Sequence, residues 1–168
     1  VVGATAGAII GKKMDKAAAE AAAVENAKVE TIEDVNGLKA VKVTFDSGIL
    51  FDFNKTELKS DAKTALAKFA TVLVENPTMD IAVYGHTDNV GTLAANQKVS
   101  LGRASKVADY LVAQGATRTQ MKVVEGRDYS MPVASNETAE GRAQNRRVEV
   151  YMYASEKMIQ DAQNEATN

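Results

Sequence analysis

The chain has 168 residues, of which 45% are hydrophobic and 25% charged, and its 22 acidic and 20 basic side chains give a formal net charge of -2. This length accommodates one domain of the common size, roughly 100–150 residues, plus an extension. The charge balance argues against a general binder of nucleic acid or of an anionic membrane surface. The sequence contains no cysteine, which excludes disulfides, thiolate metal ligands and cysteine nucleophiles.

The first 28 residues differ in composition from the rest of the chain. Residues 1–11 are apolar, with Gly3, Gly7 and Gly11 at four-residue spacing, which places the glycines on one face of a helix. This segment is too short to cross a bilayer, which takes about 20 residues. It is therefore either an apolar tail or the end of a longer glycine-zipper segment. Residues 12–28 are alanine-rich with interspersed charges and predict an exposed helix or stalk.

A β-hairpin is predicted at the start of the globular part, near Val29. Two β-prone runs, 29–35 and 38–45, flank the dipeptide Asn36-Gly37. Asn-Gly between such runs is the strongest short-range signal for a hairpin with a two-residue turn. A further strand is expected over residues 48–53, GILFDF.

Two amphipathic helices follow. The first lies in the stretch 60–77, with Ser60 as the expected N-cap and its end before Pro77. The second covers roughly 95–114, and Gly115 is placed to terminate it. The apolar stripes of the two helices consist of Leu66, Phe69, Ala70 and Leu73 in the first and Ala104, Val107, Ala108 and Leu111 in the second.

Strands are predicted before, between and after these helices. Residues 80–85 and 121–126 are β-prone, and 138–146 predicts a short helix before a closing strand at 146–153. In the closing strand Val148, Val150 and Met152 alternate with Glu149 and Tyr151. The order β-α-β-α-β-(α)-β predicts an α/β fold, a two-layer α/β sandwich in which helices cover one face of a mixed sheet.

The stretch YGHTDNVG, residues 84–91, contains the only histidine of the chain, His86. A zinc site needs several ligands, and the chain offers neither a second histidine nor a cysteine, so no metal is expected. A hydrolase needs a nucleophile and a base, and the sequence contains no Gly-x-Ser-x-Gly segment. We therefore expect His86 to be a half-buried imidazole that stabilises a turn, and the chain not to be an enzyme.

Asp88 is presented by the turn that leaves the predicted strand, at the rim of the sheet. An Asx-turn or a helix cap would also account for it. Arg103 is expected in the first turns of the following helix, where its side chain can face the same place as Asp88. The two charges then either form an ion pair with each other or make a split site for the opposite charges of one ligand. Gly102 beside Arg103 suggests a close approach of another segment, because glycine in a helix costs about 1 kcal/mol relative to alanine.

Three motifs together resemble the OmpA-like C-terminal domain, a family that includes Pal lipoproteins and flagellar-motor stator B subunits. They are GHTDNVG at 85–91, N-x-x-V-S-x-x-R-A-x-x-V at 96–107, and P-V-A-x-N-x-T-x-E-G-R-A-x-N-R-R-V-E at 132–149. The resemblance covers roughly residues 38–153. Departures from the family pattern are Val99, where leucine is usual, Gly102 at a variable position, and Asp128 in place of the second glycine of a G-x-G segment.

The resemblance implies non-covalent binding of peptidoglycan through the diaminopimelate residue of its stem peptide. In the family an aspartate that matches Asp88 holds the ammonium of the diaminopimelate head, and an arginine that matches Arg103 holds its carboxylate. Such pairing is chemically apt, since a guanidinium fork binds carboxylates through two bonds. Further positions that match family contacts are Thr87, Asn96, Asp52, Asn54 and Arg146. No cofactor is implied.

The resemblance also implies a location, the periplasm of a Gram-negative bacterium in association with the outer membrane. Because the chain begins with Val1, we expect a fragment or mature form, whose glycine-rich start leads back to a missing N-terminal anchor such as a lipid-modified cysteine. We divide the chain into 1–28, a glycine-zipper remnant and stalk, 29–155, the binding domain, and 156–168, a tail. The alternative is a structural envelope protein that self-associates through its glycine-rich segment. A third possibility, an enzyme acting on the cell wall, is disfavoured because the sequence offers no nucleophile with a general base beside it.

Overall fold

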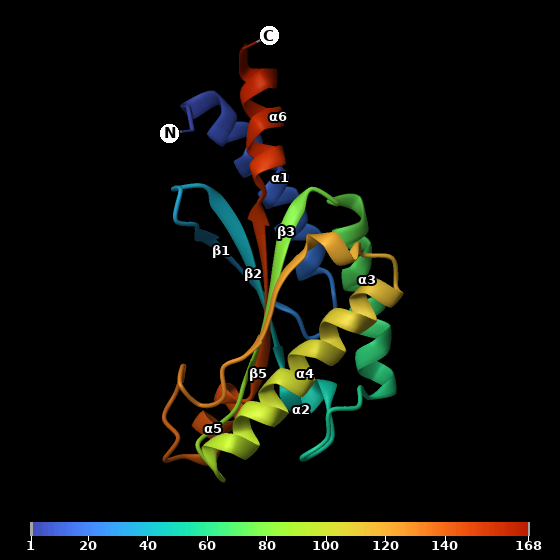
Figure 1. The fold of residues 1–168 in the computed structure, drawn as a ribbon, viewed down its shortest axis with the longest axis vertical. Coiled ribbons are helices and arrows are strands. Elements are labelled where there is room, and N and C mark those ends of the chain that lie inside the picture. Colours follow the sequence, from blue (N-terminus) through green and yellow to red (C-terminus); the bar gives the residue numbers. More distant parts are fainter. Residues whose placement is uncertain (1, 168) are drawn as a thin grey trace.

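The computed structural model describes residues 2–167, which form one mixed five-stranded sheet with helices on one of its faces (Figure 1). The strands lie in the order β1-β2-β5-β3-β4, and all neighbours are antiparallel except β3 and β4, which are parallel. The strand bounds are β1 (Lys28–Glu33), β2 (Lys39–Asp46), β3 (Met79–His86), β4 (Met121–Gly126) and β5 (Arg147–Ala154). The predicted α/β fold and mixed sheet are therefore confirmed.

The helical layer is held to the sheet by the apolar stripes that the sequence predicts. The helices are α1 (Ala4–Ala22), α2 (Ser47–Leu50), α3 (Ser60–Glu75), α4 (Leu93–Ala113), α5 (Ala139–Asn145) and α6 (Glu156–Thr167), with a short 3-10 helix at Arg118–Gln120. All eight residues of the two predicted stripes are buried, and Val148, Val150 and Met152 of β5 are buried beneath them. Gly115 ends α4 with a positive φ of 117°, as predicted, whereas Ser60 begins α3 without capping it.

Helix α1 lies in the core and differs from the exposed stalk that its alanine-rich composition predicts. It buries a stripe that consists of Ala6, Ile10, Met14, Ala17 and Ala21. In the C-terminal segment, for which the sequence left helix or tail open, residues 156–167 form α6, which packs on α1 and buries Met158 and Ala162. The hydrophobic core therefore continues across the predicted divisions at residues 28 and 155. Alanine is small enough to let a helix pack closely, so its frequency does not by itself indicate exposure.

Two local predictions are corrected. The hairpin exists, but its turn is longer than two residues. The amide of Asp34 donates to the carbonyl of Leu38, and this bond closes a three-residue loop. Gly37, not Asn36, has a positive φ, 74°. Asp34 fixes this loop because its Oδ1 accepts the amides of Asn36 and Leu38. Residues 48–53 do not form a strand; 47–50 make one helical turn, and Phe51 makes a single β-bridge to Leu58. Both edges of β2 are already paired, with β1 and β5, so the sheet has no place for this segment beside it.

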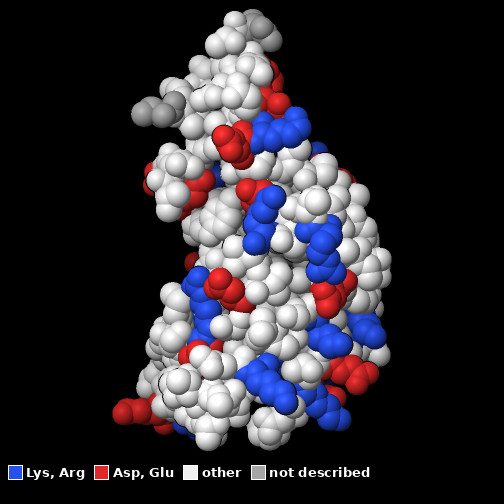
Figure 2. Space-filling model, viewed as in Figure 1, with Lys and Arg blue, Asp and Glu red and all other residues white. Residues whose placement is uncertain are grey.

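Different elements gather at the two ends of the sheet. In Figure 1 the described ends of the chain lie together at one end, with α6 and the start of α1, while α2, α5 and the start of α4 meet at the other. Positive and negative side chains are interspersed over the face shown in Figure 2, in line with the balanced charge of the chain. Within residues 2–167 we find no helix of sufficient length and apolarity to cross a membrane.

Candidate functional site

A cleft of about 390 Å³ opens at the end of the sheet where β3 stops. Four segments surround it: the loop after β3, the first half of α4, the loop between α2 and α3, and the end of α5. Its lining residues are Phe53, Asn54, Thr87, Asp88, Val90, Gly91, Ala95, Asn96, Val99, Arg103, Arg142 and Arg146. Six of the seven predicted site residues are among them, on segments separated by up to 92 positions in the sequence, and the fold brings them together here.

Asp88 lies at the wall of this cleft and is 8% exposed. Its Oδ1 accepts the amide of Val90 at 3.0 Å, which is the Asx-turn weighed for this residue. Its Oδ2 forms an ion pair with the guanidinium of Arg146 at 2.5 Å. The carboxylate is therefore held in place by the turn and keeps one oxygen directed toward a cation.

Arg103 lies opposite, in the middle of α4 and not in its first turns as predicted, and is 6% exposed. Its Nε donates to the carbonyl of Lys55 at 3.0 Å, and its guanidinium carbon lies 5.1 Å from the ring centre of Phe51. Burial lowers the pKa of Arg103, the charge of Arg146 lowers it further, and the charge of Asp88 acts in the opposite direction. Among the described residues Asp88 pairs with Arg146, and no ion pair joins it to Arg103.

Close backbone contacts explain how the middle of α4 reaches the end of β3. Gly85 and Gly126 are register partners on β3 and β4, and both lie directly under α4. A Cβ added to Gly85 would lie 2.1 Å from the carbonyl oxygen of Ser100, and one added to Gly126 would lie 2.3 Å from the amide nitrogen of Leu101. Gly102 likewise faces Thr56, 2.9 Å from the position of its absent Cβ, which is the close approach its helical placement suggested.

The remaining predicted residues have different positions around the cleft. Thr87, Asn54, Asn96 and Arg146 line it. Asn96 shapes its wall, because its Nδ2 donates to the carbonyls of Val90 at 2.9 Å and Thr92 at 3.0 Å. Asp52 does not line the cleft; only its carbonyl is involved, 3.5 Å from a terminal nitrogen of Arg103.

Six lining residues were not predicted from the sequence, among them Arg142 and Phe53. Arg142 enters the cleft from α5 and donates to the carbonyl of Asn136 at 2.9 Å. Phe53 is 87% exposed at the cleft mouth. Arg142, on α5, lies four residues before Arg146, which directly follows the end of this helix. A four-residue spacing places side chains on one face of a helix, and this was the available signal for Arg142. For Phe53 the local sequence predicted a strand, and nothing in it pointed to an exposed position.

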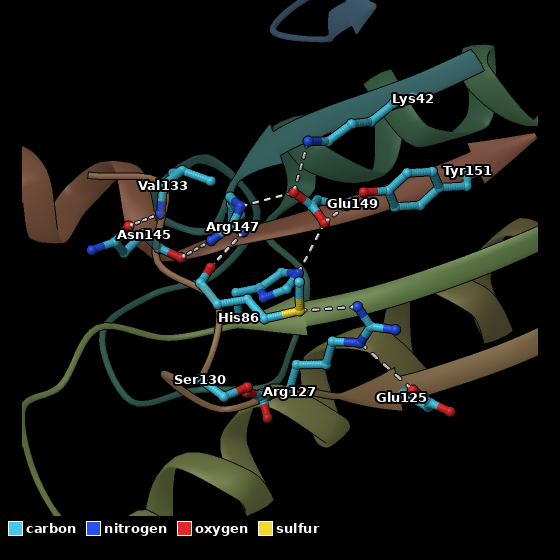
Figure 3. A network of polar contacts seen from close by, with 12 residues as sticks. Lys42, His86, Glu125, Arg127, Ser130, Val133, Asn145, Arg147, Glu149 and Tyr151 are labelled. Carbon is cyan, nitrogen blue, oxygen red and sulfur yellow. Dashed lines mark hydrogen bonds and ion pairs between the residues drawn. The ribbon is translucent and has the colours of Figure 1, made fainter. Parts of the chain in front are cut away.

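His86 belongs to a buried polar network and not to a turn as predicted. The side chain is fully buried at the end of β3, and its Nε2 lies 2.9 Å from Oε1 of Glu149 on β5 (Figure 3). Arg147 donates to the other oxygen of Glu149 at 3.0 Å, and Lys42 lies 3.2 Å from it. The loop after β4 covers this group, and the carbonyl of Met131 accepts from Arg147.

Glu149 is the negative centre of this network. Burial alone would raise its pKa, but the hydrogen bond with His86 and the charge of Arg147 outweigh burial and hold the pKa of Glu149 far below its usual range. Because Glu149 alternates with buried apolar residues along β5, its side chain belongs on the opposite face of the sheet from theirs. The side chain does lie on the second face of the sheet, but the covering loop excludes water from it. The network is thus a structural support next to the cleft.

The chain matches the OmpA family over residues 50–146, more than half of its length. The chain belongs to the OmpA family. The matched range contains the complete cleft lining, from Phe53 to Arg146.

Individual relatives agree with this membership. This OmpA-family chain is 41% identical over 118 residues to outer membrane protein A of Bordetella avium, covering 70% of this chain and 60% of that protein. The solved cell wall anchor of the T6SS from Pseudomonas aeruginosa superposes with a TM-score of 0.69 at 31% identity, over 84% of this chain and 97% of that one. The peptidoglycan-associated lipoprotein from Burkholderia pseudomallei gives a TM-score of 0.57 at 28% identity, over 62% and 87%.

The chain spans between 28% and 60% of the length of the first three curated relatives that it matches. These relatives are outer-membrane proteins, which confirms the predicted location in the envelope, on the periplasmic side of the outer membrane. Residues 2–167 contain no group of three or more histidine, aspartate or glutamate side chains placed to hold a metal ion.

Proposed function

We propose that this OmpA-family domain binds peptidoglycan non-covalently, through the diaminopimelate residue of the stem peptide, and tethers the outer membrane to the cell wall. The observation that carries the proposal is the placement of Asp88 and Arg103 in one cleft without a bond between them. Two buried opposite charges that do not neutralise each other suit a ligand with an ammonium and a carboxylate close together. The head of diaminopimelate is such a group, with both charges on one carbon.

The chemistry of each side chain suits its proposed partner. The carboxylate of Asp88 is held by the amide of Val90 and would accept from the ammonium. The guanidinium of Arg103 is oriented by the carbonyl of Lys55 and the ring of Phe51. Its terminal nitrogens, one of which lies 3.5 Å from the carbonyl of Asp52, would bind the ligand carboxylate. Thr87, Asn54 and Asn96 offer polar groups at the wall. Asp88 and Arg103 each hold a charge of the ligand and attack none of its bonds, so we propose binding without catalysis.

Two solved structures with this fold support a role at the cell wall. One solved structure with this fold is a cell wall anchor and another a peptidoglycan-associated lipoprotein. The segments that line the cleft, which include the start of α4 and the end of α5, lie at the opposite end of the sheet from the start of α1 (Figure 1). A membrane anchor attached before α1 would therefore leave the cleft facing away from the membrane.

Titration of the chain with the tripeptide L-alanyl-γ-D-glutamyl-diaminopimelate tests the proposal. Asp88→Ala and Arg103→Ala should each weaken binding by roughly 30- to 5,000-fold, because each leaves a charge of the ligand buried without a partner, a loss of about 2–5 kcal/mol. Arg103→Lys should also bind poorly, since an ammonium cannot reproduce the planar fork.

The exposed ion pair between Asp109 and Arg118 supplies matched controls, because it lies outside the cleft and presents the same two residue types. Asp109→Ala and Arg118→Ala should bind the tripeptide like the original chain. Asp88 and Arg103 variants that bind normally would refute the assignment. Failure of the original chain itself to be retained on intact peptidoglycan would instead favour the alternative, an envelope protein that self-associates through its glycine-rich helix.

A further inference from the structure

A second hollow, of about 400 Å³, opens on the face of the sheet opposite the helices. Its lining residues come from β1, β2, β5, α5 and the loop between β4 and α5, and none of them lines the cleft. The residues that β2 contributes, Lys42, Thr44 and Asp46, alternate with residues that are buried in the core. The hollow is therefore separate from the cleft and lies on the other side of the sheet.

The charges of this hollow balance one another. Its charged lining residues are the cations Lys28, Lys42 and Arg147 and the anions Glu30, Asp46 and Glu149. Lys42 lies 3.2 Å from Glu149 and 3.9 Å from Glu30, and Arg147 donates to Glu149 at 3.0 Å. A charged ligand would have to compete with these pairs. A neutral ligand that both donates and accepts hydrogen bonds suits such a lining better.

An aromatic surface adjoins the hollow. Tyr151 lies next to it, because Lys42 reaches within 5.9 Å of the centre of its ring and its hydroxyl donates to Glu149 (Figure 3). The ring of Tyr153 is parallel to that of Tyr151 within 6°, with 5.7 Å between the ring centres. Both tyrosines are half-buried, so part of each ring is open to a ligand. The hollow thus continues into an apolar surface with polar edges.

We propose that this hollow, together with Tyr151 and Tyr153, binds the glycan strand of peptidoglycan. The inference rests on the proposed function, since the strand is covalently joined to the stem peptide that the cleft would hold. An N-acetylated sugar without a free carboxylate is neutral. Its hydroxyl and acetamide groups donate and accept hydrogen bonds, and the C–H face of its ring packs on an aromatic ring.

The hollow and the cleft lie on opposite sides of the same short segment. Arg142 and Arg146 line the cleft, whereas Gln144 and Arg147 line the hollow. The helix α5 separates the two sites, and an α-helix with its side chains is about 10–12 Å wide. The sugar is joined to the first residue of the stem peptide and diaminopimelate is the third. Three extended residues span about 10 Å, so the stem peptide is long enough to reach around α5.

The test compares two probes by calorimetric titration of the full chain. One is the tripeptide L-alanyl-γ-D-glutamyl-diaminopimelate, and the other is the same tripeptide joined to the disaccharide of N-acetylglucosamine and N-acetylmuramic acid. The disaccharide should tighten binding by roughly tenfold, the scale of one or two neutral hydrogen bonds. Equal affinities of the two probes for the original chain would overturn the inference.

Variants of the hollow locate this gain. The double variant Gln144→Ala, Tyr151→Leu should reduce the tenfold gain to within about twofold. Tyr151→Phe keeps the ring and loses only the bond to Glu149, so it should keep the gain. Tyr110→Leu on α4 and Gln160→Ala on α6 are the matched controls, because both residues lie outside the hollow and the cleft, and both variants should keep the gain. A full gain in the double variant would overturn the inference.

A third probe separates this inference from the proposed function. The linear trimer of N-acetylglucosamine has no stem peptide, so its binding does not depend on the cleft. In nuclear magnetic resonance titration it should shift the amide signals of Thr44 and Gln144 in the original chain and not in the double variant, and the spectra also report whether each variant is folded. Shifts confined to the cleft, or no shifts at all, would contradict the glycan assignment. Failure of the tripeptide alone would refute the proposed function and leave this result standing.

Discussion

Replacement of Gly85 by alanine should loosen the packing of α4 on the sheet and thereby disrupt the cleft. Gly85 is not one of the glycines with a positive φ, so alanine would not strain the backbone there. The expected effect comes from the lack of space for the added methyl group. The added methyl carbon would lie 2.1 Å from the carbonyl oxygen of Ser100, 2.9 Å from its carbonyl carbon and 3.2 Å from its Cα. These are backbone atoms of a packed helix, which cannot turn aside as the end of a side chain can.

The magnitude follows from the movement that relief requires. An ordinary contact needs about 3.5–4 Å between heavy atoms, so α4 must retreat by more than 1 Å at this point. Ala104 and Val107, fully buried one and two turns further on, would lose contacts with the sheet. Overpacking costs typically 1–3 kcal/mol and occasionally more; because rigid backbone is involved, we expect at least about 3 kcal/mol of lost unfolding free energy.

Urea unfolding measures this loss. With a slope of about 1–3 kcal/mol per molar urea, the midpoint should fall by roughly 1–3 M. Gly11→Ala is the matched control: it lies within α1 with nothing within 4 Å of an added Cβ, so it should gain about 0.5–1 kcal/mol from helix propensity. Gly85→Ala should also lose tripeptide binding, because α4 carries Arg103. Equal midpoints for Gly85→Ala and the original chain would refute the close-packing argument.

Three further outcomes are expected. Because the folded-state pKa of Glu149 is depressed, its contribution to stability is complete above the unfolded value of about 4.3 and is lost as pH falls below it; thermal melts between pH 7 and 3 should show this loss, and Glu149→Gln should reduce it. Ile10→Ala should lower the unfolding free energy by about 2–5 kcal/mol, because Ile10 is fully buried between α1 and the rest of the core. Lys12→Ala, on the exposed side of α1, should have little effect in the same urea assay. An Ile10→Ala variant as stable as the original chain would support an exposed stalk instead. Tripeptide binding should survive EDTA unchanged; loss in EDTA with recovery on adding one divalent metal would contradict a site made of charged side chains alone.

Periodicity predicted those parts of the fold whose residues alternate between core and solvent. The stripes of α3 and α4 and the apolar side of β5 are buried as expected. A helix that covers a sheet and a strand of the covered sheet each present one apolar face to the core, and this gives a regular sequence period. The failures occur where periodicity carries no information. The short, mostly apolar stretch 48–53 fits a strand or a helical turn equally well, and sheet pairing decided against the strand. Alanine in α1 matches an exposed helix or a closely packed one.

The cleft was predicted in part for a related reason. Asp88 lies in a turn directly after a strand, so its place at the rim follows from local sequence. Arg103 was correctly expected in the same cleft, but its position in the middle of α4 depends on how closely the helix crosses Gly85 and Gly126, a tertiary contact. The pairing of Asp88 with Arg146 joins segments 58 positions apart, and no local pattern distinguishes it from a pair with Arg103.

The position of Asp88 is set by contacts on both sides of the turn that carries it. On one side, the buried pair of His86 and Glu149 fixes the last residue of β3 to β5. On the other, the amide of Thr87 donates to the carbonyl of Asp128 at 2.8 Å, and the amide of Asp128 donates to Oγ of Ser100 on α4 at 3.0 Å. Asp128 adopts a left-handed conformation, φ 47°, that aspartate tolerates better than most residues and that glycine also adopts readily. One chain of bonds thus joins the strand end, the covering loop and the helix of Arg103, and it holds the two proposed ligand-binding charges at a fixed separation before any ligand arrives.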